Sequence, residues 1–448
     1  MNNIEFILFT IEHWPALLCW SIFFMVLLFI PFINLVPAKV YDPFHIFVAF
    51  NFGIGYGVVA SLYQYGYINN RLFFIIMGYG LLFNTVIYLL LKRPLKLAPI
   101  FYKHVFMPFG NGRIEFILLV SIYTIFSLLM LTQTGFGALV DTNRFEAAKG
   151  FGMFVRILDL FRLVILAYWV INIFRSYRLG KSKKRFYTQF CLLILFLIFS
   201  SLQSGAKFAF IEGVYVMLVA LYAMKIDLKI NFIKAFFILL TSTVFALFVL
   251  NLNLKNSESD STGVFSDEGN IVSQRFLYRI IGNGESYYLS LPNEVIDQIQ
   301  TDNLFVRFAS QIIGISLLSK MMGYNVGDYS VGRALLLYYD PENDIAGGPT
   351  SRFDLFAYKY FGIFAFVFII LIAFILSGIA NALKKAPQNV FYISVLSALW
   401  FRALYTLIEP PAGIAYIFDT IILIFSINSL HFLYKFVRYK RTYSPVLN

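Results

Sequence analysis

The stretch at residues 347–366, GGPTSRFDLFAYKYFGIFAF, begins as a turn and ends as an apolar run. Arg352, Asp354 and Lys359 lie where the turn meets that run. Charged groups at membrane depth are costly, so each one is a functional hypothesis by default. The structural explanation is a Gly-Pro turn with Asp354 as a helix N-cap and Lys359 as an interfacial anchor. The functional explanation is a charged site at the membrane surface.

Two further groups of charged residues fall in apolar runs. Arg156, Asp159 and Arg162 are spaced i, i+3, i+6 and therefore share one helix face. They form either an internal bridge that docks this helix against its neighbours, or a site in which Asp159 orients one arginine toward an anionic ligand. Arg402 presents a similar choice, because it either forms an interfacial pair with Glu409 or lines a cavity.

Three more cations lie at the borders of apolar runs. Lys207 stands where the chain re-enters an apolar run in SSLQSGAKFAF (200–210), and it either snorkels to lipid headgroups or belongs to a site. Arg275 and Arg279 are four residues apart on one helix face, next to Tyr278. Such a pair is usually a solvated basic face, but this helix is otherwise apolar.

The composition indicates what kind of protein must position these charges. The chain has 448 residues, of which 59% are hydrophobic and 13% are charged, with a mean hydropathy of +0.74. No soluble domain of this length needs so much apolar surface, so we predict an all-α polytopic membrane protein. The first residues lack the basic region of a secretory signal, and we expect no cleaved signal peptide. Cys19 and Cys191 lie in apolar runs and predict neither a disulfide nor a metal site.

About eleven apolar runs approach the roughly 20 residues that cross a bilayer. They fall near 15–37, 44–64, 72–91, 114–132, 152–174, 186–202, 206–224, 231–254, 355–380, 388–407 and 412–434. The segment 301–320 is a surface helix, a re-entrant helix or a twelfth span. Arg307, Ser310 and Gln311 would face lipid poorly, so we favour an interfacial or partly inserted position for 303–319.

These runs predict four parts of the chain. They are an N-terminal membrane bundle of about eight helices (1–254), a large and partly helical loop (255–354), about three C-terminal membrane helices (355–436) and a basic tail (437–448). The alternate short connections hold 21 Lys and Arg on one side and four on the other. The positive-inside rule then places the C-terminus in the cytoplasm and the short N-terminus outside. The net charge of +12 is therefore mostly a topology signal, and we expect no nucleic-acid partner.

On this topology the long loop and the candidate cations lie on the outer side. The loop holds seven basic and thirteen acidic residues, and loops of this length are usually functional. The cations at its rim are Lys207, Arg275, Arg279, Arg352 and Arg402. Because the arginine fork suits bidentate phosphate contacts, the rim predicts a lipid-linked pyrophosphate whose polyprenyl tail lies in a lateral groove. The loop tyrosines suit stacking on sugar faces, although interfacial anchoring explains them equally well.

Several motifs are absent from the sequence. There is no HExxH, no Walker loop and no GxGxxG after a predicted strand, and the loop holds no His or Cys. The four histidines do not cluster in the sequence. We therefore expect neither a metal site nor a cofactor.

Two local patterns resemble those of the Wzy-type O-antigen or oligosaccharide repeat-unit polymerases of Gram-negative bacteria. SGAKFAF (204–210) is similar to the mid-chain hairpin of small, basic and apolar residues in that family. Tyr360, Phe361 and Gly362 are similar to the Tyr-x-Phe-Gly-like start of the span that follows the large loop. The plan of eleven or more spans, with one large periplasmic loop before the last helices, is also similar.

The resemblance implies a metal-independent glycosyltransferase of the bacterial inner membrane, with its active site facing the periplasm. It would move a growing glycan from undecaprenyl pyrophosphate to the sugar end of a new undecaprenyl-pyrophosphate-linked unit. Arg352 and Arg279 would stabilise charge on the leaving pyrophosphate, and Asp354 or Glu285 would take the proton of the acceptor hydroxyl. The remaining substrate-binding candidates are Lys207, Arg275, Arg162, Arg402, Lys359 and Tyr360. Donor, acceptor, membrane lipids and a chain-length regulator would be the partners.

Three alternatives remain open at this point. An O-antigen ligase shares the plan, but the resemblance implies a loop histidine for that enzyme, and this loop has none. A flippase for the lipid-linked unit would be a transporter, and transporters of that kind usually show internal repeats, which this sequence does not clearly show. A non-catalytic scaffold of an envelope-glycan assembly is excluded only by a test of activity.

Overall fold

A computed structural model gives the structure of the chain. It describes residues 1–137, 150–180, 182–206, 208–226, 241, 244, 282–343 and 347–443, with side chains described as far as residue 436. Three of the predicted site residues, Lys207, Arg275 and Arg279, lie outside the described residues. The span predicted at 231–254 lies almost wholly outside them as well.

Every regular element among the described residues is helical, and nine helices of this part are long and apolar enough to cross a membrane. They are Asn3–Phe32, Ile46–Gln64, Asn70–Lys92, Arg113–Thr134, Gly152–Arg178, Lys183–Ser204, Phe353–Lys384, Val390–Leu407 and Pro410–Phe436. Each of them overlaps one of the predicted spans. The protein is therefore a helical polytopic membrane protein.

Two predicted spans differ from the helices that the structure shows. Helix α9 (Ala209–Ala223) has 15 residues, fewer than a spanning helix usually needs. Helix α1 (Asn3–Phe29) begins well before the predicted start at residue 15, because Asn2 and Glu5 form a reciprocal capping box. The backbone kinks at His13, just before Pro15, and the helix continues.

The segment 301–320 is not one continuous helix. Gly314, with φ of +112°, separates α14 (Leu304–Ile313) from α15 (Ile315–Met322). Helices of ten and eight residues are too short to cross a bilayer. Arg307 and Ser310 are buried while Phe305 is exposed, so α14 is amphipathic, as an interfacial helix should be.

The remaining elements connect the spanning helices or build the large loop. Those before the loop are η1 (Ile30–Phe32), η2 (Lys39–Tyr41), η3 (Ile46–Phe52), α2 (Gly53–Gln64), α3 (Asn70–Lys92), α4 (Leu97–Phe106), α5 (Arg113–Thr134), α7 (Gly152–Arg178) and α8 (Lys183–Ser204). Those of the loop are η4 (Gly282–Gly284), α12 (Glu285–Ser290), η5 (Pro292–Glu294), α13 (Val295–Gln298), η6 (Val326–Tyr329) and α16 (Val331–Tyr339). The last are α17 (Phe353–Phe361), η7 (Gly362–Phe364), α18 (Ala365–Lys384), α19 (Val390–Ala403), η8 (Leu404–Leu407) and α20 (Pro410–Tyr443).

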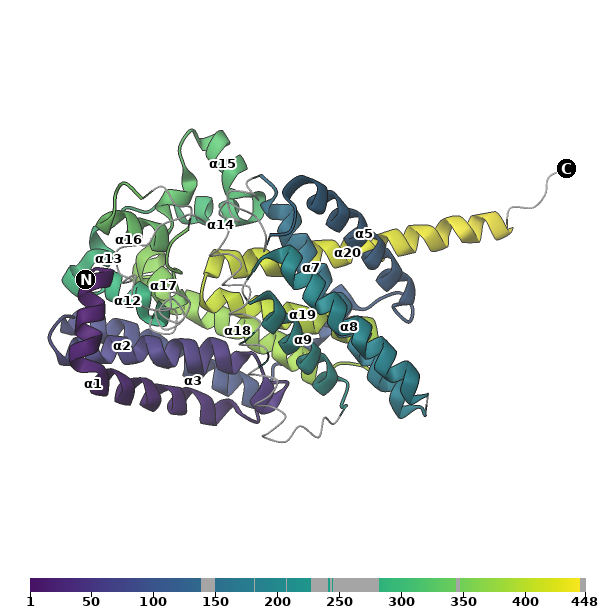
Figure 1. Ribbon diagram of the computed structural model, residues 1–448, viewed down its shortest axis with the longest axis horizontal. Coiled ribbons are helices and arrows are strands. Elements are labelled where there is room, and N and C mark those ends of the chain that lie inside the picture. The colour runs from purple at the N-terminus through teal and green to yellow at the C-terminus, as the bar shows by residue number, and fades with distance from the viewer. Residues whose placement is uncertain are drawn as a thin grey trace.

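The loop helices gather at the end of the bundle where the N-terminus lies, which we call the loop end (Figure 1). The N-terminal amino group donates to the Tyr339 hydroxyl at 2.6 Å, and Tyr288 donates to the Asn3 side chain at 3.0 Å. The C-terminal part of α20 extends beyond the opposite end. The N-terminus and the described part of the large loop thus lie at the same end of the bundle.

Helices α1 and α2 approach closely because two glycines of α2 face α1. A Cβ added at Gly57 would lie 2.3 Å from the Ser21 hydroxyl, and one at Gly53 would lie 2.4 Å from the Met25 side chain. In a membrane the hydrophobic effect does not drive helices together, because lipid tails are as apolar as the side chains. Helices associate there through close packing of their backbones at small residues. This packing fixes the position of α2, which carries part of the candidate site.

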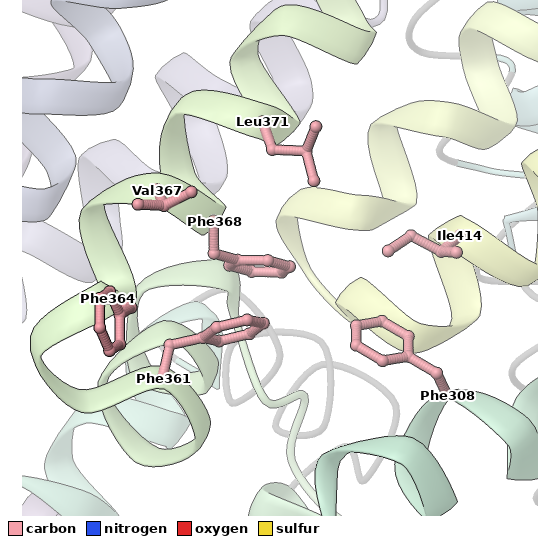
Figure 2. A pocket seen from close by; sticks show the side chains of 7 residues that line it. All are labelled: Phe308, Phe361, Phe364, Val367, Phe368, Leu371 and Ile414. Carbon is pink, nitrogen blue, oxygen red and sulfur yellow. The ribbon is translucent and has the colours of Figure 1, made fainter.

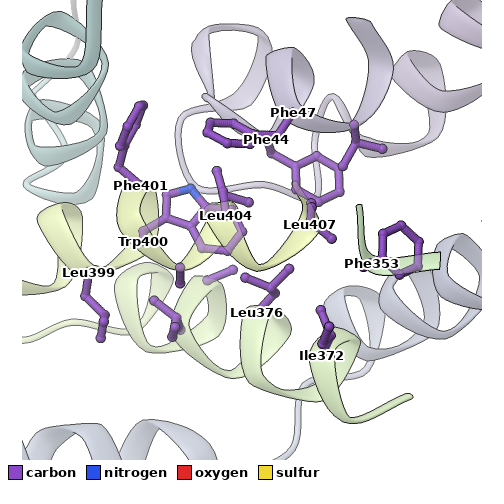
Figure 3. Close-up of a cluster of buried hydrophobic side chains, with 14 of the residues drawn as sticks. Phe44, Phe47, Phe353, Ile372, Leu376, Leu399, Trp400, Phe401, Leu404 and Leu407 are labelled. Atoms are coloured by element: carbon purple, nitrogen blue, oxygen red, sulfur yellow. The ribbon is translucent and has the colours of Figure 1, made fainter. Parts of the chain in front are cut away.

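Helices α18 and α19 form the centre of the buried core around Trp400 (Figure 3). Phe44 stacks on the Trp400 ring with centroids 6.2 Å apart. The indole Nε1 donates to Asp42 at 2.9 Å, and Asp42 also accepts the N–H groups of Ala38 and Phe44. Burial raises the pKa of Asp42 from 3.8 to about 6. This carboxyl group ties the turn after η2 to the core.

Asp42 should therefore give the protein a pH-dependent stability. A carboxyl group with a raised pKa holds its proton more tightly in the folded than in the unfolded state. Its contribution to stability is therefore greatest below about pH 4, falls as the pH rises to about 6, and is constant above. Two pKa units correspond to roughly 3 kcal/mol.

Asp42→Asn should remove this dependence, because the amide oxygen can still accept from Phe44 and Trp400. Thermal unfolding of the purified protein in detergent at pH 4.5 and pH 7 measures the effect. The melting temperature of Asp42→Asn minus that of wild type should be larger at pH 7 than at pH 4.5. Parallel pH curves for the two proteins would contradict the prediction.

Candidate functional site

Arg352 is a buried cation at the loop end, at the N-cap of α17. Its side chain is 2% exposed, and its backbone has φ of +49°, which is rare for a residue with a Cβ. The guanidinium lies over the rings of Phe52 (5.0 Å) and Tyr287 (4.9 Å). Its Nε and Nη1 atoms have no hydrogen-bond partner among the described residues. A buried charge with unused donors is costly to the fold, so Arg352 is a candidate ligand-binding residue.

Asp354 is fully buried beside Arg352 and holds two tyrosines. Its Oδ2 accepts from Tyr287 at 2.6 Å and from Tyr56 at 3.2 Å, and its Oδ1 accepts the N–H of Leu355. Burial, and next the charge of Asp354, raise the pKa of Tyr287 well above its ordinary value. Tyr287 therefore remains a donor. Its hydrogen bond to Asp354 keeps its ring in place under the guanidinium.

Gly55 of α2 makes room for this pair of groups. A Cβ at this position would lie 2.6 Å from the Tyr287 ring and 3.2 Å from Arg352 Nη1. The preceding helix η3 is a π-helix, an element that often occurs at functional sites. It places the ring of Phe52 against Arg352.

The loop before α17 is attached to the turn between η8 and α20. The N–H of Arg352 donates to the Ile408 carbonyl at 2.7 Å, and the N–H of Ser351 donates to Glu409 Oε2 at 2.9 Å. Burial raises the pKa of Glu409. Pro410 follows directly, so the first residue of α20 offers Glu409 no N–H group.

A second charged cluster lies between α7, α9 and η8. Arg162 is 2% exposed and pairs with Glu212 at 2.7 Å and with Asp159 at 3.4 Å. Tyr405 donates to the other oxygen of Glu212 at 2.6 Å. The predicted face of Arg156, Asp159 and Arg162 therefore does contain an internal bridge, and it extends to a second helix.

The second cluster continues to α20 and α14. Arg156 pairs with Asp419 at 3.0 Å and donates to the Ile312 carbonyl at 2.9 Å. Arg402 is 4% exposed and stacks on the Tyr416 ring at 4.0 Å. Its Nε and Nη2 atoms have no hydrogen-bond partner among the described residues. Arg402 and Glu409, proposed as a pair from the sequence, do not form an ion pair in this part of the chain.

A third cluster surrounds Arg307 in α14. Its guanidinium pairs with Asp302 and donates to the Val326 carbonyl at 2.7 Å. Tyr360 donates to Asp302 at 3.0 Å. Lys359 donates to the Ile296 carbonyl at 3.0 Å, so it ties α17 to the loop and does not reach Arg352.

An apolar pocket of about 590 Å³ lies beside this third cluster (Figure 2). The residues that line it are Phe308, Phe361, Phe364, Val367, Phe368, Leu371 and Ile414. Phe308 follows Arg307 in the chain, and Phe361 follows Tyr360, so polar groups adjoin one side. Phe364, Val367 and Leu371 are each at least half exposed, so the pocket borders the surface that faces lipid.

The structure brings some of the predicted site residues together and separates others. Arg352 and Asp354 adjoin, with Glu285 two residues before Tyr287 on α12. Arg162 and Arg402 belong to the second cluster, which approaches the Arg352 site through the segment 405–409 and through η3. Lys359 and Tyr360 lie farther along α17, on the loop helices.

Sequence reasoning missed the contribution of η3 and α2. Phe52, Gly55 and Tyr56 all touch Arg352, Tyr287 or Asp354. The signal was present in NFGIGYG (51–57), three alternate glycines within an apolar run. Glycine inside a spanning helix indicates close approach of another element, but the sequence does not say which element.

Comparisons with protein-family models, with curated proteins and with solved structures gave no match.

Gly55→Ala should disturb the Arg352 site more than it disturbs the fold in general. The added methyl group overlaps the Tyr287 ring, and overpacking of this kind costs about 1–3 kcal/mol. Gly78→Ala is the matched control, because a Cβ there meets nothing within 4 Å and should leave stability equal or slightly higher. Thermal unfolding in detergent measures both. Equal melting temperatures for the two variants would contradict the assigned contact.

Proposed function

We propose that the protein is a glycosyltransferase that polymerises undecaprenyl-pyrophosphate-linked oligosaccharide repeat units, as an O-antigen or surface-polysaccharide polymerase does. It would act in a bacterial inner membrane with the loop end toward the periplasm. The observation that carries the proposal is Arg352, a buried cation with unused donors at the start of a membrane helix. A phosphate at the membrane surface supplies the acceptors that these donors lack.

Arg402 provides a second cation of the same kind. Like Arg352, it is almost fully buried, stacked on an aromatic ring and left with two unused donor atoms. Three other arginines, the largely buried Arg156 and the buried Arg162 and Arg307, are each paired with a carboxylate. A polymerase must hold two lipid-linked pyrophosphates at once, and two unpaired arginines suit that requirement.

The apolar pocket supports a lipid substrate. All seven of its lining side chains are apolar, and its volume of about 590 Å³ lies within the usual range for ligand pockets. It adjoins α17 at the end opposite Arg352, and a helix of nine residues is roughly 13 Å long. A polyprenyl pyrophosphate with its tail in the pocket would carry its phosphates toward the N-terminal end of α17.

The proposed reaction depends on electrostatic stabilisation of the leaving group and not on covalent catalysis by the protein. Arg352 would contact the pyrophosphate and stabilise the negative charge that develops as the sugar–phosphate bond breaks. Asp354 would act by holding Tyr287 and Tyr56 around the guanidinium, since both of its oxygens accept hydrogen bonds. Pyrophosphate is a good leaving group, so the proposed reaction requires no metal.

Deletion of the gene in its host, followed by a gel of the surface lipopolysaccharide, tests the class of protein. A lost ladder with a single repeat unit on the lipid core supports a polymerase. Core without units, together with polymer on its carrier lipid outside, indicates a ligase. Single lipid-linked units trapped on the inner face indicate a flippase. An unchanged ladder contradicts all three.

Arg352→Ala should abolish chain growth in the complemented deletion strain. Loss of one charge-stabilising donor costs about 10²–10³-fold in rate, and Arg352→Lys should also be poor because a lysine lacks the planar fork. Arg71→Ala is the control, since that arginine is largely exposed and pairs with Asp297 at the surface. Glycan length on a gel and protein level on a blot measure the outcome. Normal glycan from Arg352→Ala, with the protein present, would falsify the role of Arg352.

Leu371→Trp should impair the use of long-chain lipid substrates. The larger ring occupies the pocket, and each prenyl methylene that loses its apolar contact costs about 0.8 kcal/mol. The KM for an undecaprenyl-linked unit should rise about tenfold, by the same relation, whereas the KM for a short-chain prenyl analogue should change little. Phe366→Trp is the control, because that exposed side chain of α18 does not line the pocket. An equal effect of Leu371→Trp on both substrates would remove the pocket from the proposal.

A further inference from the structure

The proposed polymerisation also needs a group that takes the proton of the acceptor hydroxyl. The carboxylates around the three clusters are already engaged by arginine or tyrosine side chains. They are Asp159, Glu212, Asp297, Asp302, Asp354 and Asp419. A carboxylate paired in this way has lone pairs already occupied by its partner, so it is less available to take a proton from a substrate hydroxyl. Glu285 is engaged by another residue as well.

Glu409 differs from these carboxylates. Its Oε2 accepts the N–H of Ser351, and the Ser351 side chain lies by the same carboxylate. No arginine or lysine of the described residues lies within ion-pair distance of it. Arg307 of α14 is the charged group whose field reaches Glu409. Pro410 and Pro411, which open α20, have no N–H groups with which to bind the Glu409 carboxylate.

The backbone of residues 351–352 fixes the position of Glu409 relative to Arg352. Two consecutive N–H groups, those of Ser351 and Arg352, bond to Glu409 and to the Ile408 carbonyl respectively. A shift of the loop that carried Arg352 would therefore carry Glu409 with it. Two residues of the apolar pocket lie close in sequence: Phe308 directly follows Arg307 on α14, and Ile414 of α20 is five residues after Glu409. Glu409 thus lies next to the backbone of Arg352 and just before the helix that carries Ile414 of the pocket.

From this geometry we infer that Glu409 is the general base of the proposed reaction, an inference that rests on the proposed function. The acceptor hydroxyl oxygen attacks the anomeric carbon of the donor sugar, and its proton moves to Oε1 of Glu409. The bond between that carbon and the pyrophosphate oxygen breaks, and its electron pair remains on the pyrophosphate. Undecaprenyl pyrophosphate leaves, and Glu409 then releases the proton to water.

The environment of Glu409 suits this role. Burial raises its pKa above the ordinary value of a glutamate. A base is most effective when its pKa approaches the working pH. The raised pKa therefore makes Glu409 a better proton acceptor than an exposed carboxylate. It also predicts that the rate falls as the pH drops through the pKa of Glu409.

The test compares Glu409→Gln with wild type as purified full-length proteins. The substrate is the lipid-linked repeat unit extracted from the deletion strain. Glutamine retains an oxygen that accepts the Ser351 N–H group, so the loop keeps its anchor. We expect kcat to fall about 10²–10⁴-fold, the usual contribution of a general base, with KM within about twofold and with loss of the acidic limb of the pH profile. Glu294→Gln, at an exposed carboxylate that accepts from Asn69, should match wild type.

Each outcome separates the base from the wider proposal. If wild type does not extend the lipid-linked unit, the polymerase proposal itself fails. If wild type is active and Glu409→Gln retains its rate and its pH profile, the assignment of Glu409 is wrong. Loss of the acidic limb in Asp354→Asn or Glu285→Gln, but not in Glu409→Gln, would transfer the role to that residue. A large rise in KM for Glu409→Gln with unchanged kcat would reduce Glu409 to an anchor of the loop.

Discussion

The attachment of the large loop to the turn before α20 is the constraint on which the loop end depends. The N–H groups of Ser351 and Arg352 bond to Glu409 and Ile408, more than fifty residues away in the sequence. These bonds hold Arg352 at a positive φ that a residue with a Cβ rarely adopts. The guanidinium is thereby directed into the bundle, between two aromatic rings, rather than toward solvent.

Buried charges at this end are accommodated in two ways. Arg156, Arg162 and Arg307 each meet a carboxylate, and these pairs join helices that are distant in sequence. Arg352 and Arg402 instead lie on aromatic rings, which compensate a cation only in part. The first arrangement satisfies the charge and serves the fold. The second leaves two donor atoms of each arginine unused and no carboxylate in ion-pair distance among the described residues, and for this reason we associate it with a ligand.

Prediction from the sequence was strongest where a single local property decides the structure. Nine of the predicted spans overlap long apolar helices, because hydropathy over about 20 residues is a local signal. It was weaker at helix ends, as the capping box at Asn2 and the break at Gly314 show. The sequence predicts one site formed by the rim of outward-facing cations. The structure places the two described members of that rim, Arg352 and Arg402, in different clusters.

The sequence by itself determined the class of protein, most of its spans, and the presence of costly charges near the ends of apolar runs. These follow from composition and from periodicity along one chain. Only the tertiary structure decided which charges are paired, because a carboxylate such as Glu212 or Asp419 reaches its arginine from a different helix. The tertiary structure also decided that Gly55 admits Tyr287 and that Glu409 adjoins Ser351. Such contacts depend on how helices pack across long separations, which no local pattern records.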